Sequence, residues 1–419
     1  MQGRITTGDK MHVYGCFACG VDYTIRVKIG MDDLLDPDIL VRAAEKTNKR
    51  FPSLSGRLVK NDKEYYYEDN DAPIAVINTK DRITLNSAST GYHVWAVCYS
   101  EDVLYIDCFH GATDGNGFFR LITTLLYYYC SERYGGISDE NVMVLGDSFD
   151  DREIRDPQDE LPEIDLSTVT PASYEPAFTL DTDGGLTPSE PTVWDVEMPE
   201  DAFVRFTSSH DSSPGTMISL LFARAIDELY PEREKNIISS YVVNARPMLD
   251  AKKTMHNCLS MVIMNYEDRI KKMPFTTQCT VYRGKTFIQS DEDNVKAGLT
   301  VNAGYIRMVD QMETVEEKEK AFGQMFGAGE GYVTYLVSYI GQWRHKDIGE
   351  HVKSFYSHAP STFSLMTIVS ASGGKIYMSV QQRFKEDTVR EAFLEQLAKN
   401  GIPYKVDGKM NSDVARFEI

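Results

Sequence analysis

Apolar residues recur at helical spacing in several segments of the chain and predict amphipathic helices there. Residues 36–50 carry a proline in the first turn and group isoleucine, leucine and two alanines on one face. Residues 117–133 place phenylalanine, leucine, isoleucine and tyrosine on one face and end at two glycines. The same spacing predicts further helices over residues 214–229, 315–326 and 388–399.

Short apolar runs between turn residues predict β-strands. Three pairs of runs have hairpin spacing: the two halves of residues 58–68, residues 92–99 with 103–109, and residues 362–369 with 376–382. Single strands are predicted over residues 192–198, 237–244, 259–266 and 332–340. Helices and strands mix in both halves without the regular alternation of a doubly wound sheet, and no glycine-rich nucleotide motif is present. The pattern therefore predicts a mixed α/β protein.

An acidic stretch divides the chain. The 419 residues carry a formal net charge of −19, and residues 146–201 hold 17 acidic residues against two arginines, a net charge of −15. This stretch contains seven prolines and little periodicity, which is typical of an extended linker. We therefore expect a lobe over residues 1–150, a linker over residues 151–191 and a second lobe over residues 192–419. The acidic balance argues against nucleic acid as a partner, because phosphates require a basic surface.

The cysteines and the longest apolar run bear on the location of the protein. The seven cysteines have no regular spacing, which predicts reduced thiols in a cytoplasmic protein. Cys16 and Cys19 form one CxxC pair, but no second pair completes a zinc site, so we interpret them as half-buried strand residues. The N-terminus shows no signal-peptide pattern, and the longest uncharged apolar run, residues 331–343, is too short to span a bilayer. No stable membrane insertion is expected.

Residues 107–117, DCFHGATDGNG, carry the candidate chemistry. His110 ends an apolar strand, and Asp114 and Gly115 follow just before a predicted helix. A neutral imidazole at such a turn can take a proton from a hydroxyl, an amine or a thiol. Glycines there allow backbone conformations closed to other residues, and the helix N-terminus offers N–H groups to a negative charge. Taken alone, the same residues also suit a helix cap beside a core histidine, whereas a metal site lacks further ligands.

Phe109-His110-Gly-Ala-Thr-Asp114-Gly115 resembles the HHxxxDG motif of the chloramphenicol acetyltransferase-like superfamily, which includes alcohol acetyltransferases and condensation domains. Phe109 stands where the first histidine of the motif usually lies. Further similar segments follow in the same order at residues 51–58, 213–221, 241–247 and 337–341, so the resemblance covers about residues 10 to 405. It implies two α/β-sandwich lobes joined by the acidic linker, a crossover strand near residues 332–341, and a site at the lobe interface.

The resemblance implies an acyltransferase. An acyl group would move from a thioester, acyl-CoA or acyl carrier protein, to the hydroxyl or amine of a small molecule, with no bound cofactor and no metal. His110 would act as general base, and a backbone N–H near Gly115 would help hold the oxyanion. Asp114 would be structural and pair with a distant arginine, for which Arg246 is the candidate. Because the thioester donor and the acceptor must both reach His110 and cannot share one narrow entrance, we also expect a channel that reaches its ring from two sides of the lobe interface.

Other positions keep two interpretations. Ser338 and Asn257 suit either a hydrogen bond to substrate or oxyanion, or a scaffold role. Lys252 and Lys253 suit either a coenzyme A phosphate or a solvated loop. The remaining histidines are interpreted as ordinary structural residues: His12, His93, His210, His256, His345, His351 and His358. The alternative function is a catalytically degenerate, condensation-like protein that only binds a ligand or partner. Retention of the histidine and the aspartate of the motif argues against it.

Overall fold

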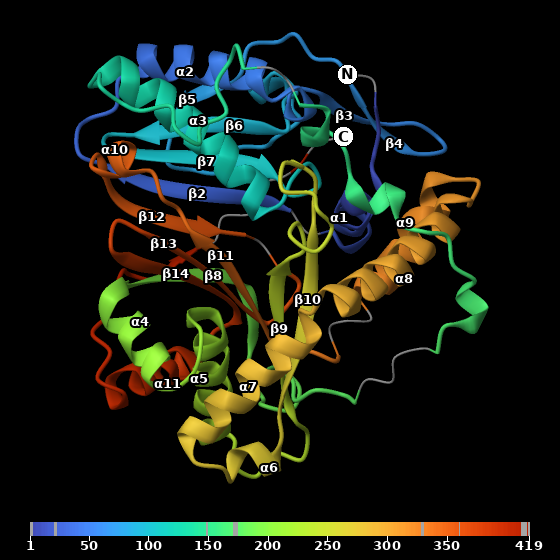
Figure 1. Ribbon diagram of the computed structural model, residues 1–419, viewed down its shortest axis with the longest axis vertical. Coiled ribbons are helices and arrows are strands. Elements are labelled where there is room, and N and C mark those ends of the chain that lie inside the picture. The colour runs from blue at the N-terminus through green and yellow to red at the C-terminus, as the bar shows by residue number, and fades with distance from the viewer. Residues whose placement is uncertain are drawn as a thin grey trace.

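The computed structural model describes residues 3–20, 23–147, 150–170, 175–327, 331–359, 361–411 and 417. Two α/β halves lie one above the other, each with a sheet and with helices on the outer face of that sheet (Figure 1). The mixed α/β class and the two-lobed arrangement expected from the sequence are thus confirmed. Within the described residues, no helix is both long enough and apolar enough to cross a membrane.

The upper half in Figure 1 is built on a five-stranded sheet in the order β12-β2-β7-β6-β5. Its strands are β2 (Thr24–Met31), β5 (Val76–Asn78), β6 (Trp95–Ser100), β7 (Val103–Phe109) and β12 (Val352–His358). Helices α2 (Pro37–Arg50) and α3 (Gly115–Arg133) bury their apolar faces against this sheet. Asp36 accepts hydrogen bonds from the N–H groups of Asp38 and Ile39 and so caps α2.

Helix α1 (Thr7–Cys19) lies beside α8 (Glu292–Asp310) and α9 (Val315–Gly327) at one side of the upper half (Figure 1). A small sheet in the order β1-β4-β3 is formed by Gly3–Arg4, Tyr65–Glu68 and Arg57–Lys60. Cys16 and Cys19 lie on α1, so the expectation that they sit on a strand is wrong. Cys16 is buried and Cys19 is half-buried.

The lower half is built on an eight-stranded sheet in the order β10-β9-β11-β13-β14-β8-β15, with β16 also paired to β8. The strands are β8 (Pro188–Pro199), β9 (Ile237–Asn244), β10 (Leu259–Tyr266), β11 (Tyr335–Gln342), β13 (Leu365–Ser372), β14 (Lys375–Phe384), β15 (Lys405–Val406) and β16 (Met410–Asn411). Strand β11 runs parallel to both of its neighbours, and the other pairs are antiparallel. The surrounding helices are α4 (Glu200–Ser209), α5 (Pro214–Leu229), α6 (Asp268–Lys271), α7 (Phe275–Gln289) and α11 (Thr388–Lys399).

The strand that crosses between the halves is β12. Strand β11 covers most of the predicted crossover range, residues 332–341, but lies inside the lower sheet between β9 and β13. Strand β12 instead pairs antiparallel with β2, with Phe355 opposite Ile29. The short helix α10 (Lys346–Gly349) precedes it and packs on α3. Residues placed in the second lobe by the sequence thus complete the sheet of the first half, and the expected lobe bounds stay a prediction.

The acidic stretch is fastened to the upper half over part of its length. It forms three short 3-10 helices, Asp151–Glu153, Pro157–Glu160 and Leu166–Thr168. The side chain of Asp156 accepts the N–H of Gly8 at 2.6 Å, and Asp159 accepts the N–H of Thr7 at 3.0 Å. These carboxylates lie at the N-terminus of α1, where free N–H groups and the helix dipole favour negative charge. Part of the excess acid therefore caps a helix rather than extending a free linker.

Candidate active site

His110 directly follows β7 and is tied to both halves of the chain through its backbone. Its N–H donates to the carbonyl of Tyr23 at 2.7 Å, and its carbonyl accepts from Nδ2 of Asn257 at 2.8 Å. The side chain is half-buried, and Nδ1 is buried without a hydrogen-bond partner. Within the described residues Nε2 also has no hydrogen-bond partner, so this nitrogen is free to meet a substrate.

A second imidazole covers the ring of His110. The ring of His12, on α1, stacks on it with centroids 4.5 Å apart and planes inclined by 10°. The ring of Tyr23 lies at an angle to both, with its centroid 6.0 Å from that of His110. Sequence reasoning treated His12 as an ordinary structural residue and did not place it here.

The surroundings keep His110 neutral at physiological pH. Burial lowers the pKa of His110 below 6.5, because a desolvated ring disfavours the charged form. A contact with its own backbone carbonyl, short of hydrogen-bond geometry, and the charge of Asp114 act in the opposite direction without reversing the shift. A neutral imidazole with an available Nε2 can accept a proton.

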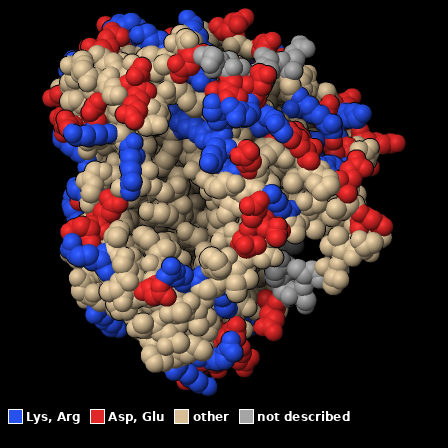
Figure 2. All heavy atoms as spheres, in the orientation of Figure 1, with Lys and Arg blue, Asp and Glu red and all other residues tan. Residues whose placement is uncertain are grey.

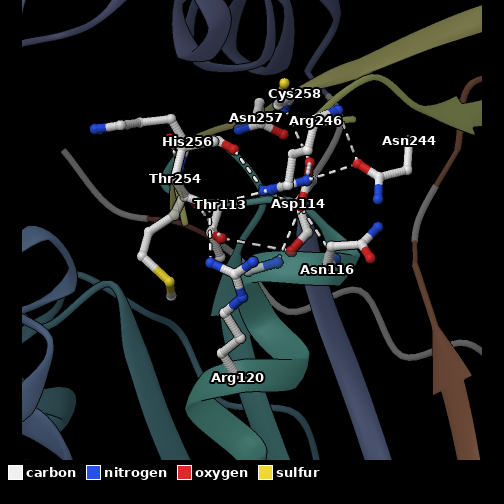
Figure 3. Close-up of polar contacts among 12 residues, drawn as sticks. Thr113, Asp114, Asn116, Arg120, Asn244, Arg246, Thr254, His256, Asn257 and Cys258 are labelled. Atoms are coloured by element: carbon white, nitrogen blue, oxygen red, sulfur yellow. Dashed lines mark hydrogen bonds and ion pairs between the residues drawn. The ribbon is translucent and has the colours of Figure 1, made fainter. Parts of the chain in front are cut away.

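Asp114 and Arg246 form a buried ion pair across the two halves (Figure 3). The two guanidinium NH groups meet the two carboxylate oxygens at 2.7 and 2.8 Å. The remaining Arg246 donors reach the carbonyls of Thr254 and His256 at 3.1 and 2.8 Å. Burial alone would raise the pKa of Asp114, but the charge and hydrogen bonds of Arg246 hold that pKa below its ordinary value. Both carboxylate oxygens of Asp114 are thus engaged by Arg246.

Asp114 is also the N-cap of α3. Its carboxylate accepts the N–H groups of Asn116 and Gly117, both at 3.0 Å, and that of Cys258 at 2.9 Å. One side chain therefore fixes the start of α3, the arginine of the β9–β10 loop and the first residues before β10. The loop that follows His110 cannot move without breaking this set of bonds.

Close approach, rather than an unusual backbone conformation, favours glycine at Gly117, and a side chain at Gly115 would be tight. Neither residue has a positive φ, which corrects the expected reason for these glycines. A Cβ on Gly117 would lie 2.7 Å from the carbonyl oxygen of Met255, and one on Gly115 would lie 3.2 Å from Ile340. The N–H of Gly115 donates no hydrogen bond within the described chain, so it remains available to a ligand.

Asn257 serves the scaffold. Its Nδ2 donates to Oδ1 of Asp9 at 2.7 Å as well as to the His110 carbonyl. Its Oδ1 is buried without a partner, so the free atom of this amide is an acceptor. The expected hydrogen bond from Asn257 to an oxyanion therefore has no donor left to make it, and we do not retain that role.

A buried charged pair lies next to Asn257. Nδ1 of His256 meets Oδ2 of Asp9 at 2.6 Å, and its Nε2 meets the carbonyl of Ile154 at 2.8 Å. Both ring nitrogens thus face acceptors, which requires the protonated ring. Burial lowers the pKa of His256, but Asp9 overcomes this and raises it to about 9. Helix α1, the acidic stretch and the β9–β10 loop meet at this pair.

The other predicted positions lie around the site without contacting His110. Ser338 lies on β11, two residues before Ile340, the residue that packs on Gly115. Lys253 is half-exposed and pairs with Asp150 at 2.7 Å. Arg120 of α3 donates to the backbone carbonyls of Lys252 and Lys253 and so holds this loop against the upper half.

The face shown in Figure 2 is hollowed between the two halves. The walls of this hollow are mostly uncharged, and Lys and Arg side chains gather on its upper side, over α3 and the β9–β10 loop. A separate cavity of about 150 Å³ lies beside His256 and is lined by Asp9, Tyr67 and Ala112, among others. The lining of this cavity includes Ala112, two residues after His110. A channel that reaches the ring of His110 from two sides stays a prediction.

Three residues of the site were missed in the sequence: His12, Asp9 and His256. Asp9 and His12 are three residues apart, a spacing that puts side chains on one face of a helix. That signal becomes visible only once residues 7–19 are read as helical. Nothing in the sequence around His256 marks it, because its partners are distant along the chain.

Comparison with known proteins shows the fold and little more. No protein-family model matches the chain, and no curated protein matches it by sequence. TRI101 of F. graminearum, solved with coenzyme A and deoxynivalenol, superposes with a TM-score of 0.64 at 10% identity over 95% of this chain and 97% of that one. TRI3 trichothecene 15-O-acetyltransferase of Fusarium sporotrichioides gives 0.55 at 10% identity over 95% and 96%. The first condensation domain of the CDA synthetase gives 0.58 at 13% identity over 96% of both chains.

The chain therefore has the two-lobed fold of the chloramphenicol acetyltransferase-like proteins. The similarity runs through nearly the whole length of the neighbours, and these include both acetyltransferases and condensation domains. The resemblance stated from residues 109–115 is confirmed at the level of the fold.

Proposed function

We propose that this protein is an acyltransferase that moves an acyl group from a thioester to a hydroxyl or amine acceptor, with His110 as general base. The observation that carries the proposal is the state of His110. Its ring is neutral and half-buried, Nε2 has no partner within the described residues, and its backbone is fixed from both halves. A base must be uncommitted and held in place, and this ring is both.

The reaction follows from this geometry. Nε2 takes the proton of the acceptor hydroxyl or amine as the acceptor oxygen or nitrogen attacks the thioester carbonyl carbon. The neutral ring then carries its other hydrogen on Nδ1, in keeping with the contact to its own carbonyl. The carbonyl oxygen becomes an oxyanion, for which the free N–H of Gly115 is the candidate donor. Collapse breaks the carbon–sulfur bond, and the thiolate takes the proton from Nε2.

Coenzyme A is the proposed carrier of the acyl group. The basic side chains above the hollow, with Lys252 and Lys253 on the β9–β10 loop, suit the phosphates of such a donor (Figure 2). Neighbours of the same fold were solved with coenzyme A, which supports this choice. Condensation domains share the fold as well, so an acyl carrier protein is the second donor to test.

A thiol-release screen tests the proposal. The purified protein is incubated with acetyl-CoA and longer acyl-CoAs in the presence of mixed alcohols and amines. Free thiol is measured with a thiol-reactive chromogenic reagent, and acylated products are measured by mass spectrometry. We expect acceptor-dependent thiol release with a matching acylated product, and loss of both in His110→Ala. Binding of acyl-CoA without product for any acceptor, with either donor class, would favour the non-catalytic alternative.

A further inference from the structure

We propose that His12 is a positioning residue for His110, holding the catalytic ring by stacking. This inference rests on the proposed function, because it assigns a role relative to the general base. The two rings are nearly parallel, with centroids 4.5 Å apart. His12 contacts the face of the His110 ring and makes no hydrogen bond to it within the described residues.

The need for such a residue comes from the missing bond at Nδ1. A catalytic imidazole is usually oriented by a hydrogen bond from its second nitrogen to a carboxylate or carbonyl. Nδ1 of His110 is buried and has no such partner, and the carboxylate of Asp114 is paired with Arg246 instead. The contact of the ring with its own backbone carbonyl falls short of hydrogen-bond geometry. Packing therefore contributes to the orientation of the ring, and the face of His12 is the flat surface that packs on it.

Helix α1 can supply a fixed surface because it is fastened next to His110. Asp9, one turn before His12, accepts both the backbone N–H and the side-chain N–H of Asn257. The same Asn257 side chain donates to the carbonyl of His110. Helix α1 thus contacts both parts of His110. Asp9 holds the His110 backbone through Asn257, and His12 packs on the His110 ring.

An imidazole also suits the charge that His110 acquires. Burial first, and then the nearby His110, lower the pKa of His12 well below 6.5, so His12 stays neutral when His110 is protonated. A cation over a neutral aromatic face is attracted to it. The charged groups that face the pair are Asp114 at the start of α3 and Asp9 on α1, which favour protonation of His110. Tyr23 contributes its uncharged ring.

Three variants separate stacking from bulk stability: His12→Ala, His12→Phe and the control Met11→Ala, a neighbouring packing residue of α1. With acetyl-CoA and the acceptor found by the screen, we expect His12→Ala to lose about 10- to 100-fold in kcat with little change in KM, because a small misplacement of a catalytic group is costly. His12→Phe keeps a flat face and should restore most of kcat. Met11→Ala should keep the kcat of the parent protein.

A titration gives a readout that does not depend on the acceptor. Histidine ring nitrogens labelled with ¹⁵N report the pKa of His110 by NMR. In His12→Ala water reaches the uncovered ring, so the pKa of His110 should rise toward 6.5, and the acid limb of kcat/KM should move to higher pH with it. In His12→Phe both should stay near the parent values. A purely structural role for His12 would lower the amount of folded protein and move neither.

The outcomes are distinguishable from failure of the proposed function. Full kcat and an unshifted His110 pKa in His12→Ala would overturn the positioning role while leaving His110 as the base. Equal losses in His12→Ala and His12→Phe would also overturn it, because stacking would then not be the property that matters. Full turnover in His110→Ala would reject the proposed function itself, whatever the His12 variants do.

Discussion

Single residues in this site differ in role because their surroundings differ. His110 and Asp114 are four positions apart, yet their hydrogen bonding differs. The Asp114 carboxylate accepts five hydrogen bonds, whereas the ring nitrogens of His110 have no hydrogen-bond partner within the described residues. A buried carboxylate without partners would be very costly, so Asp114 depends on Arg246 as much as Arg246 depends on Asp114. The pair therefore belongs to the frame of the site, and the histidine is the residue that we propose for the chemistry.

Breaking the Asp114–Arg246 pair should destabilise the protein strongly. We expect Asp114→Ala and Arg246→Ala each to lower the free energy of unfolding by about 3–5 kcal/mol, because each leaves a buried charge unpaired. The double variant should lose less than the sum of the two, since the partners share one interaction. Urea unfolding followed by circular dichroism measures all three.

An exposed pair supplies the matched control. Arg205 and Asp201 lie one turn apart on α4 with side chains 71% and 70% exposed. Arg205→Ala should change the free energy of unfolding by less than about 0.5 kcal/mol, because solvent screens such pairs. Additive losses at Asp114 and Arg246, or losses no larger than that of Arg205→Ala, would contradict the account of a shared buried pair.

At this scale the sequence predicted the motif segment, and the family resemblance named Arg246 as the candidate partner of Asp114, with which it pairs in the structure. It could not predict His12, Asp9 or the state of Asn257. Each of these depends on a contact between segments far apart in the chain. Asn257 illustrates the limit, because its residue type allows an oxyanion contact and only the two occupied donors exclude it.

At the scale of elements, α1 is held by charges that come from elsewhere in the chain. Carboxylates of the acidic stretch cap its first turn, and His256 of the β9–β10 loop pairs with Asp9. Because this pairing requires a protonated ring, the attachment of α1 is sensitive to alkaline pH.

The stability of the protein should fall between pH 6.5 and 9 through His256. Its pKa is about 9 in the folded protein and about 6.5 when unfolded, so the folded state holds this proton more tightly. The stabilisation is fully present below pH 6.5 and is lost as the pH rises through 9. At about 1.4 kcal/mol per pKa unit, it amounts to about 3–4 kcal/mol.

Urea unfolding at pH 6 and pH 9.5 checks this against His256→Gln. The parent protein should lose more stability across this interval than the variant does. Asp156 titrates on the acid side of this interval. Burial, reinforced by Asp9, raises its pKa to about 6, so its effect on stability falls between about pH 4 and 6. Parallel losses in the parent and in His256→Gln would contradict the role of His256.

Helices with a plain apolar stripe were predicted well and α1 was not. The predicted helices at residues 214–229 and 388–399 have the observed bounds. In α1 the buried face includes Gly8, Asp9 and Lys10, so burial does not follow hydrophobicity. The sequence pattern does not predict strand β2 for the same reason, because the strand contains Arg26, a charged residue that is buried against Asp107. The burial of a charged residue can be predicted only when its partner is known.

At the scale of the whole molecule, the halves interlock instead of being joined only at a hinge. Strand β12 comes from the second half of the chain and completes the first sheet. Its Phe355 is fully buried, stacks on Trp343 and meets Phe119 of α3 edge-on. The sequence shows that the chain has two mixed halves, but strand exchange between them is a property of topology that no local pattern reports.

Removing the Phe355 ring should weaken both halves together. We expect Phe355→Ala to cost about 3–5 kcal/mol, the usual range for a buried aromatic residue, because a cavity opens between β12 and α3. Fluorescence and circular dichroism should still report one shared unfolding transition. Val204, exposed on α4, provides the control, and Val204→Ala should be nearly neutral. Two separate transitions in Phe355→Ala would show that the halves unfold independently.

The central claim is that His110 is the base for acyl transfer, and the turnover of His110→Ala tests it most directly. The variant is compared with the parent protein and with His345→Ala, a histidine of a surface loop, at matched acyl-CoA and acceptor concentrations. Removal of a general base typically lowers the rate by about 10²- to 10⁴-fold, so we expect kcat of His110→Ala to fall by that factor with its folding intact. His345→Ala should keep the parent rate. A His110→Ala protein that turns over as fast as the parent would contradict the account.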